Sequence, residues 1–362
     1  MNKKLIMNVR KSLSPCPVFI DGISRSGKGA VGVALAGLAR TEHISSHNII
    51  DRLFTLYSIG LIDRNAALDN IVTEANFKLW FNYLGRNLNT NIHDFTSVIN
   101  SRDPEMYEKR MENHDNKETF SKFLEFLEKE KPITLNISDE MLYQSDLFFE
   151  AFNNLKIVVV MRHPIDVAFA WHRTGRGMGY GKDPRVIHPT LNFNNIKNIP
   201  VFAIDWPDEY EKMKPLDRAV KAIITLSNNY MHYIKNMSEN IKNNIIILSF
   251  ENFVTNTNSN MKLLCKFLNT SYTNSTPKML ERARIPRKLN NQDFESKYYG
   301  LKFNSDKKLF DKLITCSNDY EDMFDCPFSV NSISLHDQEF DYTENFVEYL
   351  EVPKFIKGKR IN

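Results

Sequence analysis

The 362-residue chain has few cysteines and no long hydrophobic run. Its four cysteines are scattered, and none belongs to a C-x-x-C pair. We therefore expect neither disulfides nor a cysteine zinc site, and we predict a reducing compartment, the cytoplasm. No stretch is apolar enough to predict a membrane span, and the apolar run after the basic MNKK start is too short for a signal peptide.

Neither sign of charge is in large excess, since the formal net charge is +3 at pH 7. A nucleic-acid-binding domain usually carries a local basic stripe or a larger excess of Lys and Arg. The composition therefore favours a small anionic ligand and predicts no nucleic-acid partner. It predicts no particular oligomeric state.

Short apolar segments alternate with longer helical patterns along the chain. Buried strands are expected at 17–21, 42–46, 132–137, 155–161 and 244–249. Helices are expected between them, at 66–88, 117–130, 141–153 and 215–240. This alternation predicts an α/β fold with a parallel sheet covered on both faces.

We expect a single α/β domain over residues 1–326. Residues 51–131 are too long for one crossover and predict a helical insertion. Residues 172–214 contain GRGMGYGKDP and predict a long functional loop. Residues 327–362 show no clear periodicity and predict a C-terminal extension that wraps over the body.

The stretch IDGISRSGKGAV, which starts at residue 20, joins a predicted strand to a predicted helix. Such a Gly-rich loop points backbone N–H groups and the positive end of a helix at an anion, and Lys28 adds a point charge. The stretch follows the nucleotide template G-x-x-x-x-G-K-[ST] as far as the lysine. Gly29 and Ala30 then stand where a hydroxyl would bind Mg²⁺. We therefore expect an anion that arrives without a metal, although a plain glycine turn remains the alternative.

A second motif, LKIVVVMRHPIDVAFAWHRT, covers residues 155–174. It predicts a buried strand with Arg162 at its carboxyl end and Pro164 in the first turn of a helix. Ligands in open α/β sheets bind at this end of the strands, where a guanidinium group suits a second phosphate. The other interpretation is that Arg162 pairs with Asp166 at the surface.

Together the two motifs resemble those of the sulfotransferase family. Arg25-Ser26-Gly27 is similar to the family's R-S-G-T-T loop, which holds the phosphosulfate end of 3′-phosphoadenosine 5′-phosphosulfate (PAPS). RHPID is similar to the R-x-P-x-D-x-x-x-S motif for the 3′-phosphate. Residues 244–268 and IPRKLN at 285–290 resemble two later family segments, the second of which also reaches the 3′-phosphate.

The resemblance implies a three-layer P-loop-type fold and transfer of a sulfuryl group from PAPS to a hydroxyl acceptor, a small molecule or a sugar, without a metal. It implies that the loop at 172–214 and His172 line the acceptor pocket. The residues expected to bind PAPS are Gly22, Ser24, Arg25, Ser26, Gly27, Lys28, Gly29, Ala30, Arg162, Arg173, Arg287 and Lys288. Lys28 is also expected to act in catalysis, by offsetting charge on the leaving phosphate oxygen.

The chain departs from the family pattern in three places. Lys28-Gly29 replaces two threonines, Ala170 replaces the motif serine, and NISDEM lacks the lysine that some members have there. An inactive module that binds nucleotide or glycan is therefore one alternative. The other is a P-loop kinase that uses ATP and Mg²⁺ with Asp139 as the metal partner.

The general base is expected in EHISSHNIID, residues 42–51, because relatives place a Glu or His there. His47 is the first candidate, since its unperturbed pKa is about 6.5. Asp51 and Glu42 are the next candidates. His43 and His47 are four residues apart but have no evident third ligand, so we expect no metal site, and a structural role for each histidine remains open.

Overall fold

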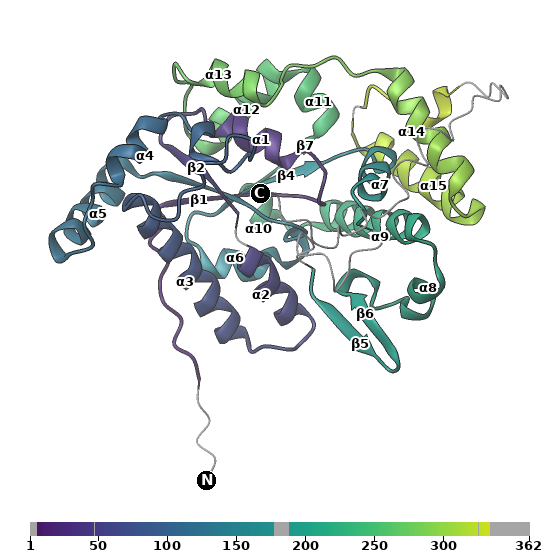
Figure 1. Ribbon diagram of the computed structural model, residues 1–362, viewed down its shortest axis with the longest axis horizontal. Coiled ribbons are helices and arrows are strands. Elements are labelled where there is room, and N and C mark those ends of the chain that lie inside the picture. Colours follow the sequence, from purple (N-terminus) through teal and green to yellow (C-terminus); the bar gives the residue numbers. More distant parts are fainter. Residues whose placement is uncertain (1–5, 47, 177–187, 325, 334–362) are drawn as a thin grey trace, which may run out of the picture. The chain divides into compact units, whose positions relative to one another are not determined.

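The computed structural model describes residues 6–46, 48–176, 188–324 and 326–333 (Figure 1). The chain divides into two compact units. The first comprises Met1–Arg162 and Asn229–Leu289, and the second comprises His163–Asn228 and Asn290–Asn362. The single domain over residues 1–326 stays a prediction. The predicted C-terminal extension lies outside the described residues from residue 334 onward.

The first unit is built on a sheet of five parallel strands in the order β2-β3-β1-β4-β7. The strands are β1 (Cys16–Asp21), β2 (Thr41–Ser46), β3 (Ile133–Ile137), β4 (Lys156–Met161) and β7 (Ile245–Ser249). All five predicted strands are confirmed, with bounds shifted by no more than one residue. Val, Ile, Leu and Phe fill most of β1, β4 and β7, because both faces of a parallel sheet are covered, whereas the edge strand β2 buries mainly polar side chains.

Helices cover both faces of this sheet (Figure 1). One face is covered by α1 (Lys28–Leu35), α11 (Phe250–Thr255), α12 (Thr257–Leu268) and α13 (Thr276–Arg282). The other face is covered by α2 (Asn48–Ser58), α3 (Arg64–Tyr83) and α6 (Ser145–Ala151). The α/β fold with a central parallel sheet is therefore confirmed.

Helices make up much of the chain between β2 and β3, where the sequence predicts a helical insertion. After α2 and α3 it forms α4 (Pro104–Arg110) and α5 (Lys117–Glu130). The Asp63 carboxylate caps α3 by accepting hydrogen bonds from the Asn65 and Ala66 N–H groups. An aromatic cluster including Trp80 and Phe123 joins α3 to α5, so this region has a small core of its own.

The second unit contains α7 (Pro164–Arg173), which packs against α14 (Asn291–Asn304) and α15 (Lys307–Met323). Lys297 of α14 donates to the Asp166 carboxylate of α7 at 2.7 Å. This unit also holds α8 (Pro207–Lys212), and α9 (Pro215–Asn236) runs from it into the first unit, where α10 (Glu239–Lys242) follows.

A β-hairpin lies inside the stretch that the sequence predicts as a long loop. Strands β5 (Thr190–Phe193) and β6 (Ile196–Pro200) pair antiparallel, and Asn194 between them has a φ of +52°. Asparagine tolerates this left-handed conformation, so the segment TLNFNNIKNIP contains a local turn signal in addition to its loop-like composition. Residues 177–187 of the predicted loop lie outside the described residues.

A search of the helices in the described part of the chain for a membrane-spanning segment gave none that combines the length and the apolar character required.

Candidate functional site

The glycine loop connects β1 to α1 at the carboxyl edge of the sheet. Gly22 has a φ of +151°, and a Cβ at this position would lie 2.4 Å from the Val160 carbonyl oxygen of β4. Gly27 and Arg25 also have positive φ values, +98° and +74°. The loop therefore turns tightly enough to present its N–H groups and the first turn of α1 to the same space.

Lys28 is buried at the mouth of this loop, with a side chain 8% exposed. Its ammonium donates to the Gly22 carbonyl oxygen at 2.6 Å and forms an ion pair with the Asp139 carboxylate. Asp139 follows β3, the neighbour of β1 in the sheet. The parallel order of these two strands thus places the lysine and the aspartate at one edge.

Ser26 adds an unused hydrogen-bond donor to the loop. Its hydroxyl is buried, 2% of the residue is exposed, and Oγ has no hydrogen-bond partner among the described residues. An unsatisfied buried hydroxyl is costly, whereas an anion in the loop would accept its proton. The loop therefore fits an anionic group by both its shape and its unused donor.

Arg162 and Arg287 form the second part of the site. Their guanidinium carbons lie 4.9 and 5.3 Å from the centre of the Phe250 ring. Burial lowers the pKa of Arg287, and the positive charges of Arg162 and Arg284 lower it further. Arg162 also donates to the Arg25 carbonyl oxygen of the glycine loop at 3.3 Å. Like charges gathered on one ring favour a dianion between them.

Asp21 and Asp51 are buried close to Lys28. Asp21 accepts hydrogen bonds from the Ser138 and Tyr230 hydroxyls and from the Met141 and Leu142 N–H groups, at 2.8 to 3.1 Å. Asp51 accepts a hydrogen bond from the Asp139 N–H, while its Oδ1 has no partner among the described residues. Burial raises the pKa of both carboxyls, and the nearby Asp139 charge raises that of Asp51 further.

Glu42, a candidate base, is part of a buried ion pair. The Arg110 guanidinium donates to its two oxygens at 2.6 and 3.0 Å, and the Tyr107 hydroxyl donates at 2.8 Å. Burial opposes the charge on Glu42, but Arg110 and these hydrogen bonds hold its pKa below the ordinary value. His43 is buried beside this pair, and burial lowers its pKa. These contacts indicate a structural role for both residues.

The remaining predicted residues are placed as follows. His47 lies outside the described residues. Arg173, in the last turn of α7, and His172, whose pKa burial lowers, belong to the second unit. Lys288 is exposed in the first unit. The structure thus brings together the glycine loop, Lys28, Arg162 and Arg287, while Asp166 binds Lys297.

Sequence reasoning missed Phe250 and Asp21 and considered Asp139 only as a kinase metal partner. All three residues end or follow a strand at the carboxyl edge of the sheet. The strand-end rule that identified Arg162 could have found them. The sequence does not show how far apart these strand ends lie, because that distance depends on the order of the strands in the sheet.

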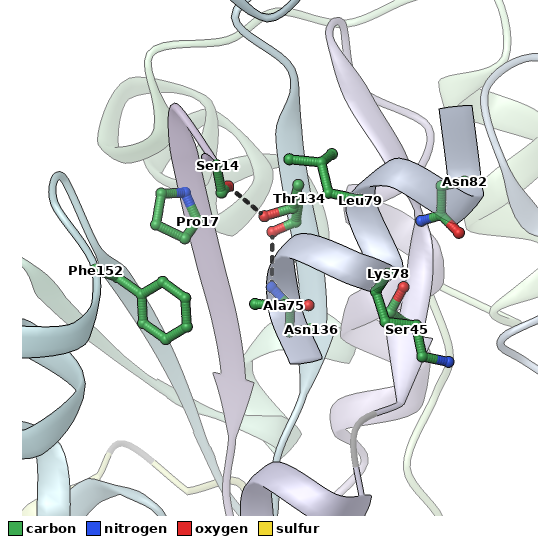
Figure 2. Close-up of a pocket in the computed structure, with 10 residues that line it drawn as sticks. All are labelled: Ser14, Pro17, Ser45, Ala75, Lys78, Leu79, Asn82, Thr134, Asn136 and Phe152. Atoms are coloured by element: carbon green, nitrogen blue, oxygen red, sulfur yellow. Dashed lines mark hydrogen bonds between the residues drawn. The ribbon is translucent and has the colours of Figure 1, made fainter. Parts of the chain in front are cut away.

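A separate small cavity lies between the sheet and α3 (Figure 2). Its volume is about 20 Å³, which is room for one water molecule. Polar side chains including Ser14, Ser45, Thr134 and Asn136 line it, and the hydroxyls of Ser14 and Thr134 hydrogen-bond at 2.9 Å. The cavity is too small for a substrate.

Comparison with known proteins gave a match to one family. A family model described as the sulfotransferase domain matches residues 87–312, a range that contains Arg162 and Arg287 and begins after the glycine loop. A search of curated protein sequences gave no match.

Several solved structures are similar to this chain at low sequence identity. The sulfotransferase domain of the Synechococcus PCC 7002 olefin synthase is 14% identical, with a TM-score of 0.39 over 96% of this chain and 98% of that chain. A sulfotransferase domain from the curacin biosynthetic pathway is 14% identical, with a TM-score of 0.40 over 96% and 100%. Sulfotransferase STF9 from Mycobacterium avium is 12% identical, with a TM-score of 0.42 over 86% and 78%.

Proposed function

The chain belongs to the sulfotransferase domain family, and we propose that it transfers a sulfuryl group from PAPS to a hydroxyl acceptor, a small molecule or a sugar. The observation that carries the proposal is the pairing of two anion sites in the first unit. One is the glycine loop with Lys28 and the unused Ser26 hydroxyl. The other is the arginine pair, Arg162 and Arg287, on the Phe250 ring. A nucleotide with phosphates at both its 3′ and 5′ positions would use both sites.

In this proposal the loop binds the phosphosulfate end, and Arg162 and Arg287 bind the 3′-phosphate. Lys28 and the loop N–H groups offset the charge that develops on the phosphate oxygen when the sulfur–oxygen bond breaks. The acceptor oxygen forms the new bond to sulfur in line with the bond that breaks, so the main task of the protein is positioning. Arg173 and Lys288 are further proposed contacts, from the resemblance to the family.

A base must take the proton of the acceptor hydroxyl. His47 and Asp51 are the proposed candidates, and the raised pKa of Asp51 supports it, because a base works best when its pKa lies close to the working pH. Glu42 is not proposed, since its oxygens are already bound by Arg110. The proton leaves the hydroxyl as the new oxygen–sulfur bond forms.

The test measures nucleotide binding first and chemistry second. We expect adenosine 3′,5′-bisphosphate to raise the melting temperature in the presence of EDTA, since a ligand that binds the native state stabilises it by mass action. Incubation with PAPS and mixed hydroxyl acceptors should then add the mass of a sulfuryl group to one acceptor in mass spectrometry. A thermal shift seen only with ATP and Mg²⁺ would overturn the proposal in favour of a kinase, while binding without any sulfated product would favour an inactive module.

A further inference from the structure

The environment of Lys28 contains more negative charge than the lysine can neutralise. Asp139 pairs with its ammonium directly, and Asp21 and Asp51 are buried within electrostatic reach of it. Three ionised carboxylates against one ammonium would leave two negative charges uncompensated. An anionic ligand in the same loop would add to this excess.

The carboxylates differ in how well their charge is stabilised. Asp21 is bound by donors from Ser138, Met141, Leu142 and Tyr230, so its oxygens are occupied. Asp51 has the Asp139 N–H on its carboxylate and one buried oxygen without a partner among the described residues. A proton on that oxygen removes one charge at the least cost, because ionised groups without partners are disfavoured in the interior.

We propose that Asp51 holds a proton beside the Lys28–Asp139 ion pair, and that Asp139 gives up the lysine to a nucleotide phosphate when the phosphate enters the loop. The inference rests on the proposed nucleotide site. Lys28 has three ammonium protons, of which one already binds the Gly22 carbonyl. Asp139 therefore competes with the phosphate for the protons that remain, and it becomes a positioning residue for the loop lysine.

Nucleotide binding is then coupled to proton uptake. A bound phosphate near Asp51 raises the proton affinity of its carboxylate, because like charges disfavour ionisation. Among the described residues, the charged groups that act on Asp51 are Lys28, Asp21 and Asp139. Tyr143 and Tyr230 face Asp21, and Glu140 acts on these two tyrosines. Binding therefore increases the fraction of molecules in which Asp51 is protonated.

The first test is calorimetric titration with adenosine 3′,5′-bisphosphate from pH 6 to 9, in buffers of different ionisation enthalpy. The wild type should take up more protons on binding than Asp51→Asn and Asp139→Asn, and the titration of the phosphates themselves cancels in this comparison. Asp139→Asn should bind several-fold more tightly at pH 8, because Lys28 is released. The control Asp115→Asn, at an exposed ion pair with Arg86, should behave as the wild type.

Equal proton uptake in all four proteins, or weaker binding by Asp139→Asn, would overturn the inference and leave the nucleotide site standing. If the wild type does not bind the bisphosphate, the proposed function fails as well.

The second test needs no nucleotide. A carboxyl with a raised pKa keeps its proton in the native state and loses it in the unfolded state, so stability falls as pH rises through this window. The melting temperature of Asp51→Asn minus that of the wild type should therefore increase between pH 5 and pH 8. A difference that stays constant with pH would mean that no proton is held there, and would overturn the inference whatever the nucleotide does.

Discussion

Gly27 and Phe250 lie so close that a Cβ on the glycine would be 2.2 Å from a carbon of the phenylalanine ring. The same ring carries the guanidinium groups of Arg162 and Arg287 on it. The glycine loop therefore touches the arginine pair through one shared side chain. A change in the loop should be transmitted to both proposed anion sites.

Gly27→Ala tests this relationship. The φ of +98° is unfavourable for alanine, and the new methyl group must displace the Phe250 ring. We expect a loss of about 1–3 kcal/mol of stability from the backbone strain, and in addition a loss of most binding of adenosine 3′,5′-bisphosphate. Urea unfolding and calorimetry measure the two effects.

Gly60→Ala is the matched control for this variant. Gly60 also has a positive φ, +73°, but a Cβ there would meet nothing within 4 Å. The Gly60→Ala variant should lose stability because of backbone strain, and it should keep its nucleotide affinity. If both variants lose affinity equally, the contact with Phe250 is not what transmits the change.

Arg162→Ala should remove the preference for a 3′-phosphate. A hydrogen bond to a charged group contributes about 1.5–3 kcal/mol, so we expect roughly a 10- to 100-fold loss of affinity for adenosine 3′,5′-bisphosphate. Affinity for adenosine 5′-monophosphate should change little. Arg86→Ala, which removes an exposed arginine paired with Asp115, is the control. Equal losses for the two nucleotides would place the 3′-phosphate elsewhere.

Glu42→Gln should destabilise the protein without acting on the chemistry directly. Removing one partner of a buried ion pair leaves Arg110 charged and unpaired, which costs about 3–5 kcal/mol. Because the pKa of Glu42 is lowered in the native state, its contribution is present above the unfolded value of about 4.3 and is lost at lower pH. The stability difference from the wild type should therefore be large at pH 7 and shrink in acid. A difference below about 1 kcal/mol at pH 7 would show that the pair contributes no more than a surface one.

The two base candidates can be separated by activity. Loss of the base should lower turnover by roughly 10²–10⁴-fold while nucleotide binding persists. The rate should rise with pH, because either candidate must lose its proton before it can accept one. If His47→Ala is inactive and Asp51→Asn turns over normally, histidine is the base, and the reverse result would identify the carboxylate. Should both variants remain active, neither residue acts as the base.

The strands of the central sheet, and the two motifs that we propose bind anions, could be recognised from the sequence alone. The spacing of apolar residues, the content of β-branched residues and the glycines between segments are local properties. All five strands of the sheet and helices such as α5 were therefore predicted almost to the residue. Arg162 was found in the same way, because its place after a buried strand is also local. The hairpin at 190–200 was not predicted, although its asparagine turn is a local signal too.

Which strand ends lie next to each other could be seen only in the folded protein. The order β2-β3-β1-β4-β7 brings the turn after β3 beside the glycine loop, and so it places Asp139 on Lys28 although the two residues are far apart in sequence. Tertiary packing also pairs Glu42 with Arg110 and places the Phe250 ring in contact with Arg162 and Arg287. Partners and proton affinities of this kind depend on burial and on distances across the sheet, and no pattern along a single strand contains them.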